Sequence, residues 1–151
     1  PAKMKLAVTG CPRNCAEALC KDLGVVAVDG GRWEIYVGGA AGAHIRKGDL
    51  LATVDSPEKV MTLTGRFLQY YRESANWLER TYKWVPRVGI EHLREVLVED
   101  PDDDFVTALD ERMQKSIDAY RDPWRDGQEP RSEGQFRSSL PLLPLPKVPV
   151  R

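Results

Sequence analysis

The sequence predicts an α+β fold in which β-hairpin strands pack with several helices. Two observations lead to this expectation. A strong turn signal, Asp29-Gly30-Gly31, stands between two runs of β-branched or alternating residues. Apolar residues then recur at helical spacing through residues 57–80, and shorter periodic segments follow. With 151 residues, the chain has the size of one ordinary domain.

The predicted strands lie in the first third of the chain. They are short apolar or alternating segments, at residues 5–8, 25–28, 33–37 and 49–54. Between the first two, residues 15–23 have helix-forming content and stop at Gly24, which predicts a helix there. The small side chains of residues 38–43 predict a loop whose backbone can approach a large flat group.

Helical periodicity predicts three helices in the rest of the chain, at residues 57–80, 89–98 and 105–120. Ser56 is suited to cap the first helix and Pro57 to begin it, and the apolar stripe of this helix extends to Leu78. Pro86 is expected to break the chain before the second helix. We therefore divide the chain into a domain at 1–98, an acidic linker with a terminal helix at 99–122, and a disordered Pro-rich tail at 123–151.

The overall composition excludes some classes of partner. The chain has 22 basic and 23 acidic residues and a formal net charge of −1, so bulk charge gives no reason to expect nucleic acid or an anionic membrane as partner. No apolar run of about 18 residues predicts a membrane span, and no leader is visible. The three cysteines suit a reducing compartment, and we expect the protein in the cytoplasm.

Two of the cysteines, Cys11 and Cys15, are separated by three residues. Thiolates with this spacing are half of the ligand set of a four-iron four-sulfur cluster, which takes four cysteines. A cysteine at the amino end of the predicted helix would have its thiolate stabilised by unpaired backbone N–H groups. We expect the missing ligands upstream of Pro1, because the chain lacks an initiator Met and resembles a carboxy-terminal piece. Incidental cysteines and zinc bound with His44 and His92 are the competing interpretations.

Longer motifs around these cysteines favour one family. They are Thr-Gly-Cys-Pro-Arg-Asn-Cys-Ala-Glu at 9–17, Lys-Asp-Leu-Gly-Val-Val at 21–26, Trp-Glu-Ile-Tyr-Val-Gly-Gly at 33–39, and Trp-Val-Pro-Arg-Val-Gly at 84–89. Together they resemble the sirohaem-containing nitrite and sulfite reductases. The match is closest to the carboxy-terminal part of the large subunit of the assimilatory NAD(P)H-dependent nitrite reductase, and it extends over about the first 100 residues.

The resemblance implies a set of cofactors and roles. Cys11 would be a ligand of a 4Fe-4S cluster, and Cys15 would be both a cluster ligand and the axial ligand of sirohaem. The remaining two cysteines, the residues that bind nitrite, and the FAD and NAD(P)H modules would lie in upstream portions of the same polypeptide. The implied reaction is the six-electron reduction of nitrite to ammonium. No catalytic residue is expected in this chain, which alone would be inactive, and a small subunit is a possible further partner.

One position departs from the family pattern. Ala40 stands where the family commonly has Asn in a Gly-Gly-Asn-Gly-Gly loop, which removes a polar side chain near the expected macrocycle. A structural or interaction module that has lost its cofactors is therefore a second hypothesis. A sulfite reductase is a third hypothesis, and a thiol-redox or zinc-binding protein is a fourth. We expect the third cysteine, Cys20, to lie on a helix face without a metal.

Overall fold

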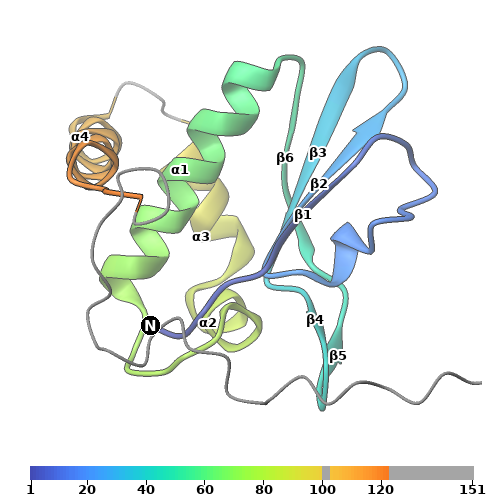
Figure 1. The fold of residues 1–151 in the computed structure, drawn as a ribbon, viewed down its shortest axis with the longest axis horizontal. Coiled ribbons are helices and arrows are strands. Elements are labelled where there is room, and N and C mark those ends of the chain that lie inside the picture. The colour runs from blue at the N-terminus through green and yellow to red at the C-terminus, as the bar shows by residue number, and fades with distance from the viewer. Residues whose placement is uncertain (100–102, 123–151) are drawn as a thin grey trace, which may run out of the picture. The chain divides into compact units, whose positions relative to one another are not determined.

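The computed structural model describes residues 1–99 and 103–122. Within it, Pro1–Asp118 forms one compact unit. A mixed β-sheet lies beside a layer of helices, so the predicted α+β class is confirmed (Figure 1). The Pro-rich tail predicted at 123–151 lies outside the described residues.

The main sheet has four strands in the order β1-β2-β3-β6, and their bounds are Leu6–Thr9, Leu23–Val28, Arg32–Val37 and Asp49–Val54. β1 pairs with β2 in parallel, and the other two pairings are antiparallel. The predicted hairpin is confirmed as β2–β3. Its turn contains Gly30 and Gly31 at φ 77° and 70°, a left-handed conformation that favours glycine.

A second, two-stranded ribbon follows the hairpin, where a loop was predicted. It pairs β4 (Ala40–Ala41) with β5 (Ile45–Arg46). The Arg46 guanidinium donates to the carbonyl of Gly38 at 2.7 Å and to the carboxylate of Asp49 at 2.5 Å. The ribbon is thereby tied to the adjoining ends of β3 and β6.

The helices are α1 (Pro57–Ser74), α2 (Thr81–Val88), α3 (Ile90–Arg94), which continues into a π-helical turn η2 (Glu95–Glu99), and α4 (Asp104–Asp118). Ser56 caps α1 as predicted, because its Oγ accepts a hydrogen bond from the Lys59 N–H at 3.3 Å. The helix predicted at 89–98 corresponds to α3 with η2, and its Leu93 and Leu97 are fully buried. The last helix is confirmed within two residues at each end.

An aromatic cluster centred on Trp84 joins α1 to α2. Phe67, Tyr70 and Tyr71 of α1 surround the fully buried Trp84 edge-to-face, with ring centroids 5.3–5.7 Å away. This arrangement is the one that aromatic quadrupoles favour. The core thus forms between these rings and the apolar residues of the central strands, such as Ile35.

Ion pairs and hydrogen bonds fix α4 against α1. Asp110 accepts bidentate hydrogen bonds from Arg66, at 2.7–3.0 Å, and Glu73 accepts bidentate bonds from Arg112, at 2.7 and 2.9 Å. The hydrogen bonds from Arg112 lower the pKa of Glu73. A planar guanidinium that faces a carboxylate fixes the relative orientation of the two groups, in addition to attracting it by charge. These pairs therefore set the register of the two helices in addition to their apolar contact.

The prediction that the first helix continues to residue 80 was wrong. α1 ends at Ser74, and Leu78 is exposed at φ 55°, so it is not part of the core stripe. Glu79 holds the loop that replaces the last turns. Its carboxylate accepts two bonds from Arg87, at 2.8 and 2.7 Å, and its carbonyl accepts one from the Tyr71 hydroxyl. Tertiary contacts, rather than helical periodicity, determine the backbone here.

The break predicted at Pro86 was also wrong, because α2 runs through this residue. Proline removes a single N–H from the helix. The bond from the Gly89 N–H to the Val85 carbonyl, at 2.8 Å, closes the helix beyond it. α2 ends at Val88, because the φ of 95° at the following Gly89 is not compatible with further helix.

The Glu79–Arg87 pair generates a pH prediction. Hydrogen bonding to Arg87 lowers the pKa of Glu79 below its ordinary value of 4.5. A carboxyl whose pKa is lower in the folded state stabilises the fold above its unfolded pKa, and this contribution is lost as pH falls through the folded pKa. In urea denaturation, we expect Glu79→Gln to reduce stability at pH 7, with the difference from wild type shrinking below pH 4.5. The exposed Glu111→Gln is the control and should show no such loss. A deficit for Glu79→Gln that stays constant with pH would contradict the assignment.

Candidate functional site

The two cysteines of the spaced motif lie in the loop that joins β1 to a short 3₁₀ helix, η1 (Ala18–Cys20). Cys15 is exposed, Cys11 is partly exposed, and both are free thiols. The α-helix predicted at 15–23 does not form, so Cys15 does not stand at the amino end of a helix. That part of the argument for a stabilised thiolate was wrong.

The backbone of this loop takes an uncommon conformation on either side of Cys15. Asn14 and Glu17 have φ values of 56° and 53°, in the left-handed region that non-glycine residues rarely occupy. Local hydrogen bonds hold this conformation. The Asn14 N–H donates to the Cys11 carbonyl at 3.2 Å, and the Asn14 carbonyl and side-chain oxygens accept from Glu17 and Leu19 at 2.9 and 3.3 Å. Two left-handed residues within four positions prevent an α-helix here.

Several backbone N–H groups of the loop remain available as donors, and those of Cys15 and Ala16 lie at and beside the second cysteine. Within the part of the chain that the structure describes, the N–H groups of Cys15 and Ala16 have no hydrogen-bond acceptor. Buried or structural N–H groups are rarely left unpaired, whereas those of a solvent-facing loop can donate to a ligand. The loop thus offers two thiols together with free donors.

Glycines in and beside the sheet allow η1 to approach it closely. A Cβ on Gly24, in β2, would lie 2.0 Å from the carbonyl oxygen of the fully buried Ala18. A Cβ on Gly39 would lie 2.5 Å from the carbonyl oxygen of Lys21. The Gly48 N–H also donates to the Leu19 carbonyl, at 2.7 Å. Backbone therefore packs directly on backbone, and these contacts position the end of the cysteine loop.

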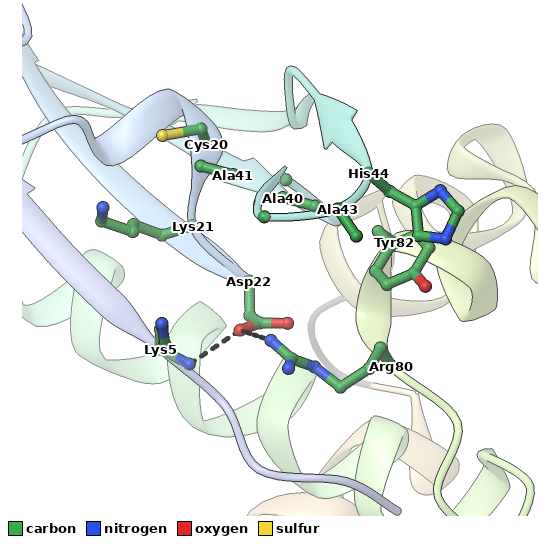
Figure 2. Close-up of a pocket in the computed structure, with 12 residues that line it drawn as sticks. Lys5, Cys20, Lys21, Asp22, Ala40, Ala41, Ala43, His44, Arg80 and Tyr82 are labelled. Carbon is green, nitrogen blue, oxygen red and sulfur yellow. Dashed lines mark hydrogen bonds and ion pairs between the residues drawn. The ribbon is translucent and has the colours of Figure 1, made fainter.

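A cleft of about 270 Å³ lies beside η1, on the side of the ribbon and α2. Figure 2 shows Cys20 and Lys21 on one wall, Ala40 to His44 on another, and Arg80 and Tyr82 on a third. The His44 ring contacts the Tyr82 ring, with centroids 5.2 Å apart. Cys20, predicted on a helix face, instead ends η1, and its Sγ donates to the Glu17 carbonyl at 3.2 Å.

The buried carboxylate of Asp22 joins three elements at the base of this cleft. Its Oδ2 accepts from the backbone N–H of Lys5 and from the Arg80 guanidinium, both at 2.8 Å (Figure 2). Its Oδ1 accepts from the hydroxyl of Thr81, the first residue of α2. The backbone carbonyl of Asp22 accepts from the Gly38 N–H at 2.9 Å. Asp22 thus connects three parts of the chain, at Lys5, at Gly38 and at the start of α2.

Sequence reasoning missed Asp22 and Gly24, although one signal was present. Gly24 directly precedes the β-branched run that starts at Val25, and a glycine within a strand is typical of a site that another backbone approaches closely. We interpreted it as the end of a helix instead. For Asp22, no signal was available, because its partners Lys5, Arg80 and Thr81 lie far away in the sequence.

The zinc hypothesis receives no support from the described residues. Among residues 1–99 and 103–122, no three His, Cys, Asp or Glu side chains are arranged to hold a metal ion. His44 lies between β4 and β5, and His92 lies on α3 with its ring 3.4 Å from the Tyr70 hydroxyl. In the same ranges, no helix has the length and apolar character needed to cross a membrane.

The close packing of η1 gives a first prediction for this site. Gly24→Ala places a methyl group where the Ala18 carbonyl stands, so strand or η1 must move. We expect the free energy of unfolding to fall by about 1–3 kcal/mol, the usual cost of overpacking. Gly42→Ala is the matched control, because a Cβ there meets nothing within 4 Å. Equal urea midpoints for both variants would contradict a close approach of the Ala18 carbonyl to Gly24.

The position of Asp22 gives a second prediction. Asp22→Ala leaves the Arg80 guanidinium and the Lys5 N–H without their acceptor. We expect a loss of about 2–3 kcal/mol in urea denaturation, typical of a broken pair of which one member is buried. In Asp49→Ala, which removes the more exposed pair with Arg46, the loss should stay below about 1 kcal/mol. Similar losses in the two variants would contradict a central role for Asp22.

Comparison with known proteins agrees with this architecture. The nitrite and sulphite reductase 4Fe-4S domain family matches residues 1–104. An NAD(P)H nitrite reductase of Bacillus subtilis is 52% identical over 126 residues, which are 83% of this chain and 15% of that protein. An NAD(P)H nitrite reductase large subunit of Klebsiella oxytoca is 35% identical over 141 residues, 91% of this chain and 14% of that protein. An assimilatory-type sulfite reductase of Nitratidesulfovibrio vulgaris is 37% identical over 98 residues, 65% of this chain and 44% of that protein.

The chain therefore spans less than half the length of each of these relatives. The family match covers more than half of the chain and includes the cysteine loop, the sheet and the first three helices. The resemblance expected from the sequence motifs is confirmed. The chain belongs to the nitrite and sulphite reductase 4Fe-4S domain family.

Proposed function

We propose that this chain is the part of an NAD(P)H-dependent nitrite reductase large subunit that supplies two of the four cysteine ligands of a 4Fe-4S cluster. The ligands are Cys11 and Cys15. The single observation that carries the proposal is the loop between β1 and η1, where two accessible free thiols stand in a backbone held in place by its own hydrogen bonds.

The residues present fit an iron–sulfur cluster in their chemistry. Thiolates are the ligands of such clusters, and N–H donors to the sulfurs tune the reduction potential. Cys11 and Cys15 provide the first, and the unpaired N–H groups of Cys15 and Ala16 can provide the second. The left-handed conformations of Asn14 and Glu17 support a functional role, because strained backbone persists mainly where function requires it.

Cys20 has a different environment from the two proposed ligands. Its Sγ donates to the Glu17 carbonyl, and it lies on η1, which packs against the sheet. We propose that it binds no metal. This difference makes Cys20 the internal control for the other two cysteines.

Sirohaem is the second proposed cofactor, with Cys15 as its axial ligand. When bound, the cluster and the sirohaem supply the electron transfer and the anion-binding iron that nitrite reduction needs. The more exposed of the two thiols is assigned this double role. Ala40, at the start of β4, lines the cleft, and its methyl group offers no polar contact to that wall.

The rest of the polypeptide is the proposed partner. The relatives are about seven times longer than the matched segment in the case of the nitrite reductases. We propose that the other two cysteines, the nitrite-binding residues and the FAD and NAD(P)H modules lie in that remainder, and that a small subunit is a further possible partner. A reducing compartment such as the cytoplasm suits the free thiols.

Nitrite is favoured over sulfite as the substrate by the comparisons. The sequence identity to the nitrite reductase of Bacillus subtilis is 52% over 126 residues, against 37% over 98 residues for the sulfite reductase. Sulfite is the second candidate, because the matched family includes reductases of both anions. A cofactor-free module is the third candidate, and the cofactor content of the parent polypeptide distinguishes it from the other two.

The proposal predicts the cofactor content of the complete parent polypeptide, produced anaerobically. Iron, acid-labile sulfide and the visible spectrum are measured for wild type and for three single variants. We expect about four cluster irons and sirohaem bands in the wild type. Cys11→Ser should lose the cluster, and Cys15→Ser should lose the cluster and alter the sirohaem bands as well. Cys20→Ser should retain both.

Contrary outcomes separate the three candidates. A colourless and iron-free wild-type protein, produced with adequate cofactor supply, would identify a module without cofactors. Loss of the cluster from Cys20→Ser to the same extent as from Cys11→Ser would overturn the ligand assignment. Turnover of sulfite in preference to nitrite would replace the substrate but leave the ligands unchanged.

A further inference from the structure

The helix-covered face of the sheet continues onto β1, where nothing among the described residues covers it. In-register neighbours on adjacent strands share a face of a sheet. Val8 is in register with Val25, which is in register with Ile35, and both of these belong to the core. The exposed fraction of the side chain rises from 3% at Val25 to 64% at Val8.

The next row of the sheet shows the same change. Leu6 is in register with Leu23, and Leu23 with Val37. Leu23 is 2% exposed and Val37 is fully buried, but Leu6 is 50% exposed. Two adjacent rows of the apolar core therefore end abruptly at the same strand, so the exposure is a property of β1 and not of a single side chain.

β1 is also an edge strand whose outer backbone groups lack a partner strand among the described residues. Lys5 directs its backbone toward β2, because its N–H donates to Asp22 and its carbonyl accepts from Leu23. Backbone groups of successive residues in a strand point to opposite edges. The N–H and carbonyl groups of Leu6 and Val8 therefore face the open edge, beside their own exposed apolar side chains.

An open edge of this kind is normally protected. Natural sheets shield edge strands with charges, prolines, bulges or a covering element, because bare edges pair with other chains. β1 has the sequence Leu-Ala-Val-Thr, with no charge, proline or bulge. The other edge strand, β6, differs, since its Thr53 side chain is exposed while Leu51 and Ala52 are buried.

We infer that β1 is an internal strand of the complete protein and that a further strand from the remainder of the same polypeptide pairs with its open edge. The inference rests on the proposed function. There, the remainder of the polypeptide brings two more cysteines to the loop that follows β1, in which Cys11 lies two residues after the strand ends. A strand beside β1 would bury Leu6 and Val8, extend the sheet, and place its own neighbouring residues close to that loop.

The length of the relatives makes this remainder the favoured occupant. The chain spans only 15% and 14% of the two nitrite reductases described above, so a large part of the same molecule is available at high effective concentration. A segment tethered in one polypeptide also avoids the entropy that a separate partner loses on binding. A second copy of the chain, paired edge to edge, is the competing occupant, and the test distinguishes the two.

The test is amide hydrogen exchange on the complete parent polypeptide, with its mass determined by sedimentation at the same concentration. We expect the amides of Leu6 and Val8 to exchange at least about 100-fold more slowly than unstructured amides, in a monomeric sample. Rapid exchange at both positions would overturn the inference. Protection that appears only at concentrations where the protein dimerises would overturn it too and would identify a second copy as the occupant.

A pair of variants tests the side chains independently. Val8→Lys places a charge on the face proposed to be buried, and Thr53→Lys places the same charge at an exposed site on the other edge strand. We expect the thermal midpoint of the parent to fall by at least about 3 °C more for Val8→Lys than for Thr53→Lys. Equal midpoints for the two variants would contradict burial of Val8.

Cofactor content, measured on the same samples, separates this inference from the proposed function. A parent that holds its cluster but exchanges the Leu6 and Val8 amides rapidly would refute the added strand alone. A parent that protects these amides but contains no iron would refute the cluster and leave the added strand established.

Discussion

The close approach of η1 to the sheet is the constraint on which the cysteine loop depends. At Gly24 and Gly39, backbone meets backbone at distances that leave no space for a Cβ. Interiors transmit strain because they are densely packed, so a change at either glycine displaces the segment that ends the loop of Cys11 and Cys15. Iron–sulfur ligation depends on where sulfur atoms stand. The two glycines thus act on the position of the cysteine loop.

Asp22 stabilises the same region through hydrogen bonds. A carboxylate buried in apolar surroundings is costly unless each oxygen is hydrogen-bonded, and Asp22 meets this requirement with Lys5, Arg80 and Thr81. Lys5 directly precedes β1, and Arg80 and Thr81 lie at the start of α2. One residue, two positions after η1 ends, therefore joins the sheet to the helical layer. Hydrophobic packing around Trp84 fixes the same two layers farther along α2.

Local patterns in the sequence were sufficient for the parts of the fold that local forces determine. The β2–β3 hairpin followed from its Gly-Gly turn, and the start of α1 from Ser56 and Pro57, because turn and cap preferences act within a few residues. The helix predicted at 15–23 failed because two left-handed residues and the approach of η1 to Gly24 outweigh helix propensity. The prediction that Leu78 belongs to the core stripe was wrong for a similar reason, since the Glu79–Arg87 pair holds a loop at this position. Long-range partners decide these positions, and a single sequence does not reveal them.

Two kinds of incompleteness coincide at β1. The cysteine loop that follows it offers two cysteines where a cluster takes four, and the strand itself leaves two rows of the core uncovered. Metal ligation and folding are coupled wherever binding requires segments that folding brings together. If one further segment supplies both the missing ligands and the missing cover, the hydrophobic energy of burying Leu6 and Val8 contributes to holding the ligands in place. The cluster, in turn, cross-links the two segments, so each event stabilises the other.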